Sequence, residues 1–376
     1  MKLIFSFIVI LILSIGNFFI ILRNFKKIKK NITIVQDRGG FGNTFEICDL
    51  ARYIFKSNYL FIFFFDSPRH NPYLPLLFTK NYIALRSSIR LKIFGRYYSI
   101  GMQESNKSQN LIIELLVCLI KIICKKRFFR NDDLRKKEIY NFSKHSGYEK
   151  FDFRHDKGSQ WKGLYYYLVN IKKKKINFKP LEKKLSIKEL NFFNKLKKNK
   201  NICIYLRNRK SKADKTNYLR DGSQSKEYIK MIKYILNKNY NVLLTGDEVF
   251  SKNQLDRINI NSKHKIYDVN DYSDDNRNLL RLLFVDLGEI YISESGGANY
   301  FGLYNKRSIH INTFPFCESL TCHNFILKKI IDPKKKIKLN KANIKNLFYH
   351  NFDLGKYKLL PNSSEELYRF IKRNIN

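Results

Sequence analysis

The chain has 376 residues, a length typical of about two domains, and 44% of them are hydrophobic, which excludes a wholly disordered protein. Lys and Arg number 72 against 32 Asp and Glu, a net charge of +40, which excludes an acidic solvating protein. This charge favours a polyanionic partner: nucleic acid, an anionic membrane face or a phosphorylated substrate. Because the lysines are scattered, a basic surface that only keeps the chain soluble is the alternative.

Residues 3–22 form an uncharged, mostly apolar run. As a helix it would span about 30 Å, the thickness of a hydrocarbon core. An uncleaved membrane anchor is favoured over a signal peptide, because no Ala-x-Ala cleavage site follows. Five basic residues follow the run: Arg23, Lys26, Lys27, Lys29 and Lys30. They predict a single-pass protein of the cell membrane with its main body in the cytoplasm, its lysines against anionic headgroups. A body in the Golgi lumen is the other orientation.

A strand, a glycine-rich turn and a helix are predicted next. The strand covers 32–36, the helix 44–55, and the turn between them contains Asp37, Gly39, Gly40, Gly42 and Asn43. A second, fully apolar strand at 59–65 is typical of a parallel sheet buried on both faces. It ends at Asp66 and His70, where ligands of α/β sheets bind.

Two further segments separate the halves of the chain. The apolar segment 111–124 is short for a membrane span, so we interpret it as a buried or membrane-facing helix. The Lys-dense, helical segment 172–200 is interpreted as the connection between domains.

The second half alternates strands and helices, which predicts another parallel sheet. The expected strands are 201–206, 240–244, 266–269, 289–292 and 308–312, and the expected helices are 225–236 and 278–286. Two such halves, each with a glycine or serine turn after a strand, predict a ligand in the cleft between them.

Three turns of this second half are candidate nucleotide-sugar-binding sites. Ser293, Ser295, Gly296 and Gly297 follow a strand and open a helix, where backbone N–H groups and the helix dipole favour a phosphate. An ordinary strand-to-helix turn is the alternative.

Arg207 follows the first of these strands, and its guanidinium suits a diphosphate. A surface arginine is the alternative. Thr245, Gly246 and Asp247 follow the next strand, at 240–244, and are candidate nucleotide-sugar-binding residues.

Several classes of site are not indicated. Phe45 stands where a Gly-x-Gly-x-x-Gly fingerprint needs glycine, and neither a P-loop nor a His-Glu-x-x-His motif occurs. No Asp-x-Asp metal clamp or Cys-x-x-Cys pair is present, so no metal is expected, and Cys322 beside His323 is a weak zinc candidate. No nucleic-acid-binding motif is evident.

The segments 39–55 (GGFGNTFEICDLARYIF), 203–236, 245–247 and 291–316 (YISESGGANYFGLYNKRSIHINTFPF) resemble fucosyltransferase-like glycosyltransferases of bacterial surface-polysaccharide synthesis. The resemblance implies an α/β fold with two Rossmann-like domains facing a cleft, the GT-B type, here preceded by one N-terminal transmembrane helix. The expected boundaries are 1–30 for the anchor, 31–175 for the acceptor domain, 176–200 for the Lys-rich connection and 201–376 for the nucleotide-sugar domain.

The resemblance also implies a nucleotide-sugar donor as co-substrate, no other cofactor, and no obligatory metal. Arg207 matches the arginine that binds the donor phosphate, and Asn43 matches a residue near the reacting centre. Tyr205 stands where many relatives have His, a departure that leaves the catalytic base open.

The sequence therefore predicts a glycosyltransferase acting on a glycan or lipid-linked acceptor at the membrane. Asp37 and Asp66 are candidate bases if the reaction inverts, and the glycine turn with Asp66 and His70 is assigned to the acceptor side. The alternatives are a membrane-tethered, non-enzymatic binder of anionic polymers and a transferase fold that has lost catalysis.

Overall fold

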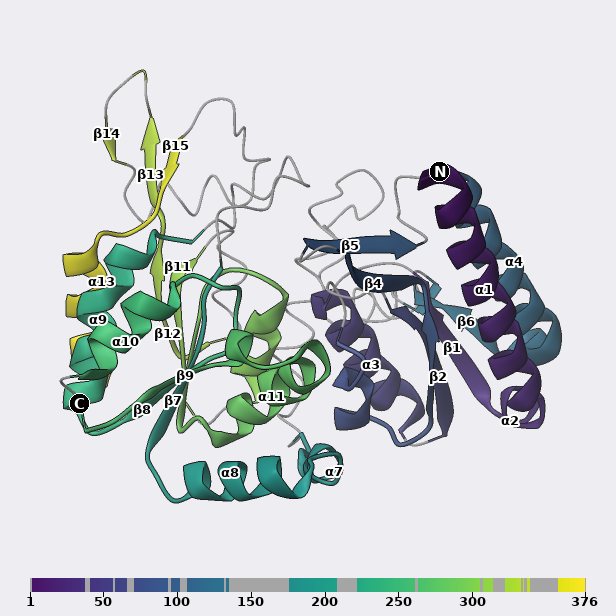
Figure 1. Ribbon diagram of the computed structural model, residues 1–376, viewed down its shortest axis with the longest axis horizontal. Helices are drawn as coiled ribbons and strands as arrows, with labels where there is room; N and C mark the ends of the chain where they lie inside the picture. Colours follow the sequence, from purple (N-terminus) through teal and green to yellow (C-terminus); the bar gives the residue numbers. More distant parts are fainter. Residues whose placement is uncertain are drawn as a thin grey trace, which may run out of the picture. The chain divides into compact units, whose positions relative to one another are not determined.

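The computed structural model describes residues 2–37, 41–56, 58–65, 71–93, 96–101, 107–131, 133–134, 176–207, 222–260, 263–304, 307–313, 322–332, 334, 337–338 and 358–375. The chain divides into two compact units, 1–145 and 146–376. Each unit has its own parallel sheet (Figure 1). The prediction of a mixed α/β protein with parallel sheets is confirmed.

The sheet of the first unit has the order β3-β2-β1-β6, with every neighbouring pair parallel. Its strands are β1 (Ile32–Gln36), β2 (Tyr59–Phe65), β3 (Tyr82–Arg86) and β6 (Phe128–Arg130). The apolar strand β2 lies inside the sheet, where both of its faces are buried. A separate hairpin pairs β4 (Ser88–Ile93) with β5 (Arg96–Gly101).

Helices cover both faces of this sheet. Figure 1 shows α1 and α4 side by side on one face and α3 on the other. The helices of the unit are α1 (Lys2–Arg23), α2 (Phe25–Lys30), α3 (Phe41–Phe55), α4 (Lys107–Cys124) and the 3-10 turns η1 (Leu74–Leu77) and η2 (Lys125–Arg127). One apolar cluster joins Val9, Leu13, Leu60, Ile62 and Ile120, so α1 and α4 complete the core of the unit.

The N-terminal helix packs on the sheet of its own unit. The buried amide of Asn17 donates to the carbonyl of Arg86 (2.8 Å) and accepts from its N–H (3.1 Å). Within the described ranges, no helix combines the length and apolar character that crossing a bilayer requires. The predicted transmembrane helix at 3–22 is therefore not supported.

The sheet of the second unit has six parallel strands in the order β12-β11-β10-β7-β8-β9. They are β7 (Asn201–Tyr205), β8 (Asn241–Leu244), β9 (Ile266–Asp268), β10 (Ile290–Ser293), β11 (Ser308–Thr313) and β12 (Asn324–Leu327). From β7 the chain moves outward to β8 and β9 and then returns to place β10 on the other side of β7. The boundary between β7 and β10 is thus the topological switch point, where ligands of open α/β sheets bind.

The second unit has its helices around this sheet and a small antiparallel sheet near the C-terminus. The helices are α7 (Lys179–Glu182), α8 (Ile187–Lys197), α9 (Ser225–Asn237), α10 (Lys252–Ile260), η4 (Val269–Asp271), α11 (Asp274–Leu287), η5 (Gly297–Leu303) and α13 (Ser364–Asn374). The small sheet has the order β14-β13-β15, from β13 (Lys329–Asp332), β14 (Ile337–Lys338) and β15 (Lys358–Leu360). Leu367 and Ile371 of α13 pack with Ile232 and Ile235 of α9, which extends the core under β7 and β8.

The segment 176–200, interpreted from sequence as a connection, forms α7 and α8 of the second unit. Leu181, Phe193 and Leu196 are buried. Its lysines therefore lie on the outer face of packed helices.

Candidate functional site

The ends of β7 and β10 come together at the switch point. The backbone N–H of Arg207 donates to Oε2 of Glu294 at 2.9 Å. Its guanidinium Nη1 donates to the carbonyl oxygen of Ser295 at 3.3 Å. Two segments that the sequence indicated separately, Arg207 and the serine-glycine turn, therefore form one site.

Gly296 makes this approach possible. Its φ of 153° is a backbone conformation that residues with a side chain rarely adopt. A Cβ atom there would lie 3.3 Å from Nη1 of Arg207 and 3.8 Å from the ring of Tyr205. The glycine thus leaves room for the guanidinium directly over the turn.

Glu294 is the buried centre of this site. No part of it is exposed, and it accepts hydrogen bonds from the N–H of Arg207, the hydroxyl of Tyr228 and Nδ2 of Asn312 (2.8 Å). Burial raises the pKa of Glu294 above its usual range. The carboxyl group ties the ends of β7, β10 and β11 to α9, which fixes the backbone that carries Arg207.

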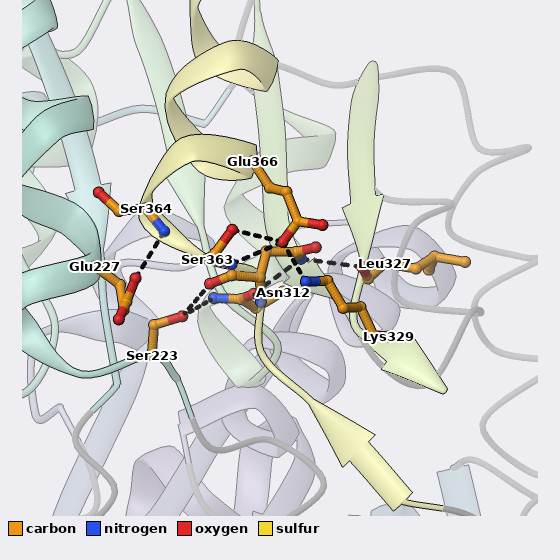
Figure 2. A network of polar contacts seen from close by, with 9 residues as sticks. Ser223, Glu227, Asn312, Leu327, Lys329, Ser363, Ser364 and Glu366 are labelled. Carbon is orange, nitrogen blue, oxygen red and sulfur yellow. Dashed lines mark hydrogen bonds and ion pairs between the residues drawn. The ribbon is translucent and has the colours of Figure 1, made fainter. Parts of the chain in front are cut away.

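A polar network continues from Asn312 toward the C-terminal helix (Figure 2). Nδ2 of Asn312 also donates to Oγ of Ser223 (2.9 Å), and its Oδ1 accepts from the N–H of Asn362 (2.7 Å). Ser363 and Glu366 form the capping box of α13. The last described helix therefore braces the residues that hold Glu294.

The predicted residues after β8 pack against the backbone of Leu206, next to Arg207. The N–H of Asp247 donates to the carbonyl of Leu206 (2.9 Å), and a Cβ on Gly246 would collide with that carbonyl. The hydroxyl of Thr245 is directed to the carbonyl of Ile204 (3.4 Å), so it serves the sheet. Asp247 itself is exposed.

The serines of the predicted phosphate turn are engaged inside the protein. Ser293 donates to Oδ1 of Asn299 (2.9 Å), and Ser295 is directed to the carbonyl of Asn312 (3.5 Å). Gly297 opens a seven-residue 3-10 helix, η5, in place of the α-helix expected there. The aligned dipole of a long α-helix is therefore not available at this turn, and the positive charge next to it is that of the Arg207 guanidinium.

Arg281 is a second cation at this edge that the sequence analysis missed. Its Nη2 donates to the carbonyl of Gly246 (3.2 Å), and its buried Nε has no hydrogen-bond partner among the described residues. Burial raises the pKa of Tyr205, and the nearby charges of Arg207 and Arg281 act in the opposite direction. Tyr205 therefore lies close to both guanidinium groups. An arginine between buried leucines of the predicted helix 278–286 was the available signal.

Asp268, at the end of β9, supplies a pH-dependent test of this edge. Its Oδ1 accepts from the N–H and from Nδ2 of Asn270, and burial raises its pKa from 3.8 to about 6. A raised folded-state pKa means that wild-type stability falls as pH rises from about 4 through 6. The Asp268→Asn variant keeps the acceptor atom and has no charge to desolvate.

We expect Asp268→Asn to equal wild type near pH 4 and to exceed it by about 2–3 kcal/mol at pH 8 in urea unfolding. The exposed Asp256→Asn on α10 is the control and should show no such trend. A difference that does not change with pH would contradict the assignment.

In the first unit, Asp37 follows β1 and forms an ion pair with Arg130 at the end of β6. Arg130 also pairs with Glu114 of α4 (2.6 Å), and both carboxylates raise the pKa of Arg130. Gly42 lies in the first turn of α3. Gly39, Gly40, Asp66 and His70, together with the side chain of Asn43, lie outside the described residues.

Within the described ranges, no group of three His, Cys, Asp or Glu side chains is arranged to hold a metal ion. The expectation that no metal is needed stays a prediction.

No protein-family profile and no curated protein matches the chain. Solved structures of the wall teichoic acid polymerase TagF are similar at a low level. One is 11% identical, covers 96% of this chain and 97% of that chain, and has a TM-score of 0.29. A variant of TagF soaked with CDPG is 12% identical in sequence, and the alignment covers 99% of this chain and 98% of that chain with a TM-score of 0.24. Similarity at this level does not assign an activity, and the resemblance to fucosyltransferase-like enzymes stays a prediction.

Proposed function

We propose that the chain is a glycosyltransferase of surface-polysaccharide synthesis that takes its sugar from a nucleotide-sugar donor. The observation that carries the proposal is the guanidinium of Arg207, held over Ser295 and Gly296 at the switch point between β7 and β10. A cation at the carboxyl edge of a parallel sheet is suited to the diphosphate of a nucleotide.

In this mechanism, Arg207 stabilises the negative charge that develops on the departing nucleoside diphosphate. Arg281 adds a second positive charge near Tyr205. Two fixed guanidinium groups perform the task for which other transferases use a metal ion, so we propose that the reaction is metal-independent and needs no cofactor besides its donor.

We assign the acceptor, a glycan or a lipid-linked saccharide, to the first unit, and place the reaction at the cytoplasmic face of the cell membrane. Asn43 and the residues after β1 and β2 are the proposed acceptor side. Because Asp37 is ion-paired with Arg130, it would have to leave that pair to act as a base. Asp66 is the other proposed base.

The alternative is a non-enzymatic binder of anionic polymers, which the net charge of +40 favours. It leaves unexplained why a glycine with φ of 153° gives an arginine room at the switch point. Polymer binding that falls steeply with salt, without any nucleotide binding, would favour this alternative.

A transfer assay tests the proposal. The full chain is incubated with labelled UDP-, GDP- and CDP-sugars and a lipid extract as acceptor, with and without chelator. We expect label to pass from one donor class to the acceptor, with the chelator having no effect. Donor binding without transfer would indicate a fold that has lost catalysis, and no binding of any donor would contradict the proposal.

A further inference from the structure

We propose that the outer faces of α1 and α4 form a single surface that lies in the plane of an anionic lipid bilayer. Thirteen large hydrophobic side chains are exposed among the described residues, and Ile187 alone lies outside α1, α2 and α4. Such concentration on one part of a protein marks an interaction surface, since scattered exposed apolar residues are the ordinary case.

The exposed residues follow the helical repeat. On α1 they are Ile8, Leu11, Ile12, Ile15, Phe18, Phe19, Ile20 and Leu22, and Phe25 continues them on α2. On α4, Leu111, Leu115 and Ile122 recur at the spacing of one helix face. The two helices are neighbours and run alongside each other (Figure 1). We call these twelve residues the apolar face.

The opposite faces of both helices are already occupied. Val9, Ile10 and Leu13 of α1 are buried on the sheet, as are Leu116 and Ile120 of α4. Asn17 fixes α1 to β3 through two hydrogen bonds with Arg86. The helices therefore present one face to the core and one face outward, which is the arrangement of a protein that lies on a membrane.

Charge indicates the occupant. The C-terminal ends of α2 and α4 lie together, because Arg127 after α4 donates to the carbonyl of Lys30 (2.9 Å). The exposed basic residues at this end are Arg23, Lys26, Lys29, Lys30, Lys121, Lys125, Lys126 and Arg127. In segments 2–30 and 107–127 the sole acidic residue is Glu114, which is paired with Arg130. We call these exposed basic residues the basic rim. Anionic lipid headgroups supply the negative charge that complements the basic rim.

A second copy of the chain fits the same surface less well. A symmetric partner would bring an equally basic rim to the interface, and like charges there are unfavourable. A bilayer offers hydrocarbon to the apolar face and phosphate to the rim at the same time. The lipid surface is therefore the occupant that matches both features.

Vesicle co-sedimentation of the full chain tests the inference. One set of vesicles is phosphatidylcholine alone, and the other contains about one-quarter phosphatidylglycerol, a charge density that attracts basic rims. We expect binding to the mixed vesicles, and we expect Leu115→Asp with Ile122→Asp to weaken it at least about tenfold. Both side chains are exposed, so the fold is retained, which circular dichroism verifies.

The matched control is Ile187→Asp, because Ile187 is 82% exposed and lies on α8 of the second unit. It should bind vesicles like wild type. Wild-type protein that stays in the supernatant would overturn the inference, as would vesicle binding that the double variant leaves unchanged. A dimer in solution that the double variant dissociates, without vesicle binding, would assign the apolar face to a second copy and also overturn it.

Discussion

Arg207→Ala is expected to lower kcat/KM for the nucleotide-sugar donor about 100- to 1000-fold, the loss typical of removing one group that stabilises developing charge. The side chain is partly exposed, and its guanidinium donates to the carbonyl of Ser295, so the fold should survive. Arg207→Lys keeps the charge and loses the planar guanidinium fork, so its kcat/KM should lie between that of wild type and that of Arg207→Ala.

The measurement is steady-state transfer kinetics beside circular dichroism of each variant. Arg257→Ala, on the exposed side of α10, removes the same side chain away from the site and should leave kcat/KM unchanged. An Arg207→Ala enzyme with wild-type kinetics would remove Arg207 from the donor site.

Glu294→Ala is expected to destabilise the second unit by about 3–5 kcal/mol, because it takes the buried acceptor away from three hydrogen-bond donors, of which those of Tyr228 and Asn312 are on fully buried residues. Those donors are the N–H of Arg207, the hydroxyl of Tyr228 and Nδ2 of Asn312. Glu294→Gln keeps the volume and one acceptor oxygen, so its loss should be smaller. Urea unfolding followed by far-UV circular dichroism measures both.

The exposed Glu248→Ala, on the loop after β8, is the control and should change the free energy of unfolding by less than about 0.5 kcal/mol. If Glu294→Ala unfolded at the same urea concentration as the Glu248→Ala control, the buried carboxyl group would not hold the end of β7.

Much of the fold follows from local pattern. The apolar segment 59–65 forms β2 within the same bounds, and the helix predicted at 225–236 forms α9 over Ser225–Asn237. Alternation of strands and helices predicts parallel sheets, and parallel strands bring their carboxyl ends to one edge. In the structure this edge holds Arg207 after β7 and Gly296 after β10, two segments that the sequence indicated separately.

The residues that support the site could not be predicted in the same way. Asn312 and Asn362 are 50 positions apart, and no local pattern brings them together. Glu294 lies between two serines of the predicted phosphate turn and was not singled out from the sequence, yet it is fully buried. Its role depends on partners from three other elements, which only the packed structure shows.

For the N-terminal helix, the sequence predicted a membrane span that the structure does not support. A run apolar on every side predicts a membrane span, since hydropathy counts residues without regard to the face they occupy. In α1 the inward residues, Leu13 among them, complete the core of the first unit. Asn17, the polar residue that fixes the helix to β3, was the signal in the sequence that it packs against protein.

The most direct test of the account is isothermal titration calorimetry of the full chain in the presence of a chelator. It compares the affinity for a nucleoside diphosphate with the affinity for the nucleoside that carries the same base. UDP, GDP and CDP are each paired with uridine, guanosine and cytidine. The account predicts that one diphosphate binds much more tightly than its nucleoside, and that Arg207→Ala removes most of that difference while nucleoside binding stays the same. Equal affinities for diphosphate and nucleoside in wild type, or a difference that Arg207→Ala leaves intact, would contradict a diphosphate site at the switch point between β7 and β10.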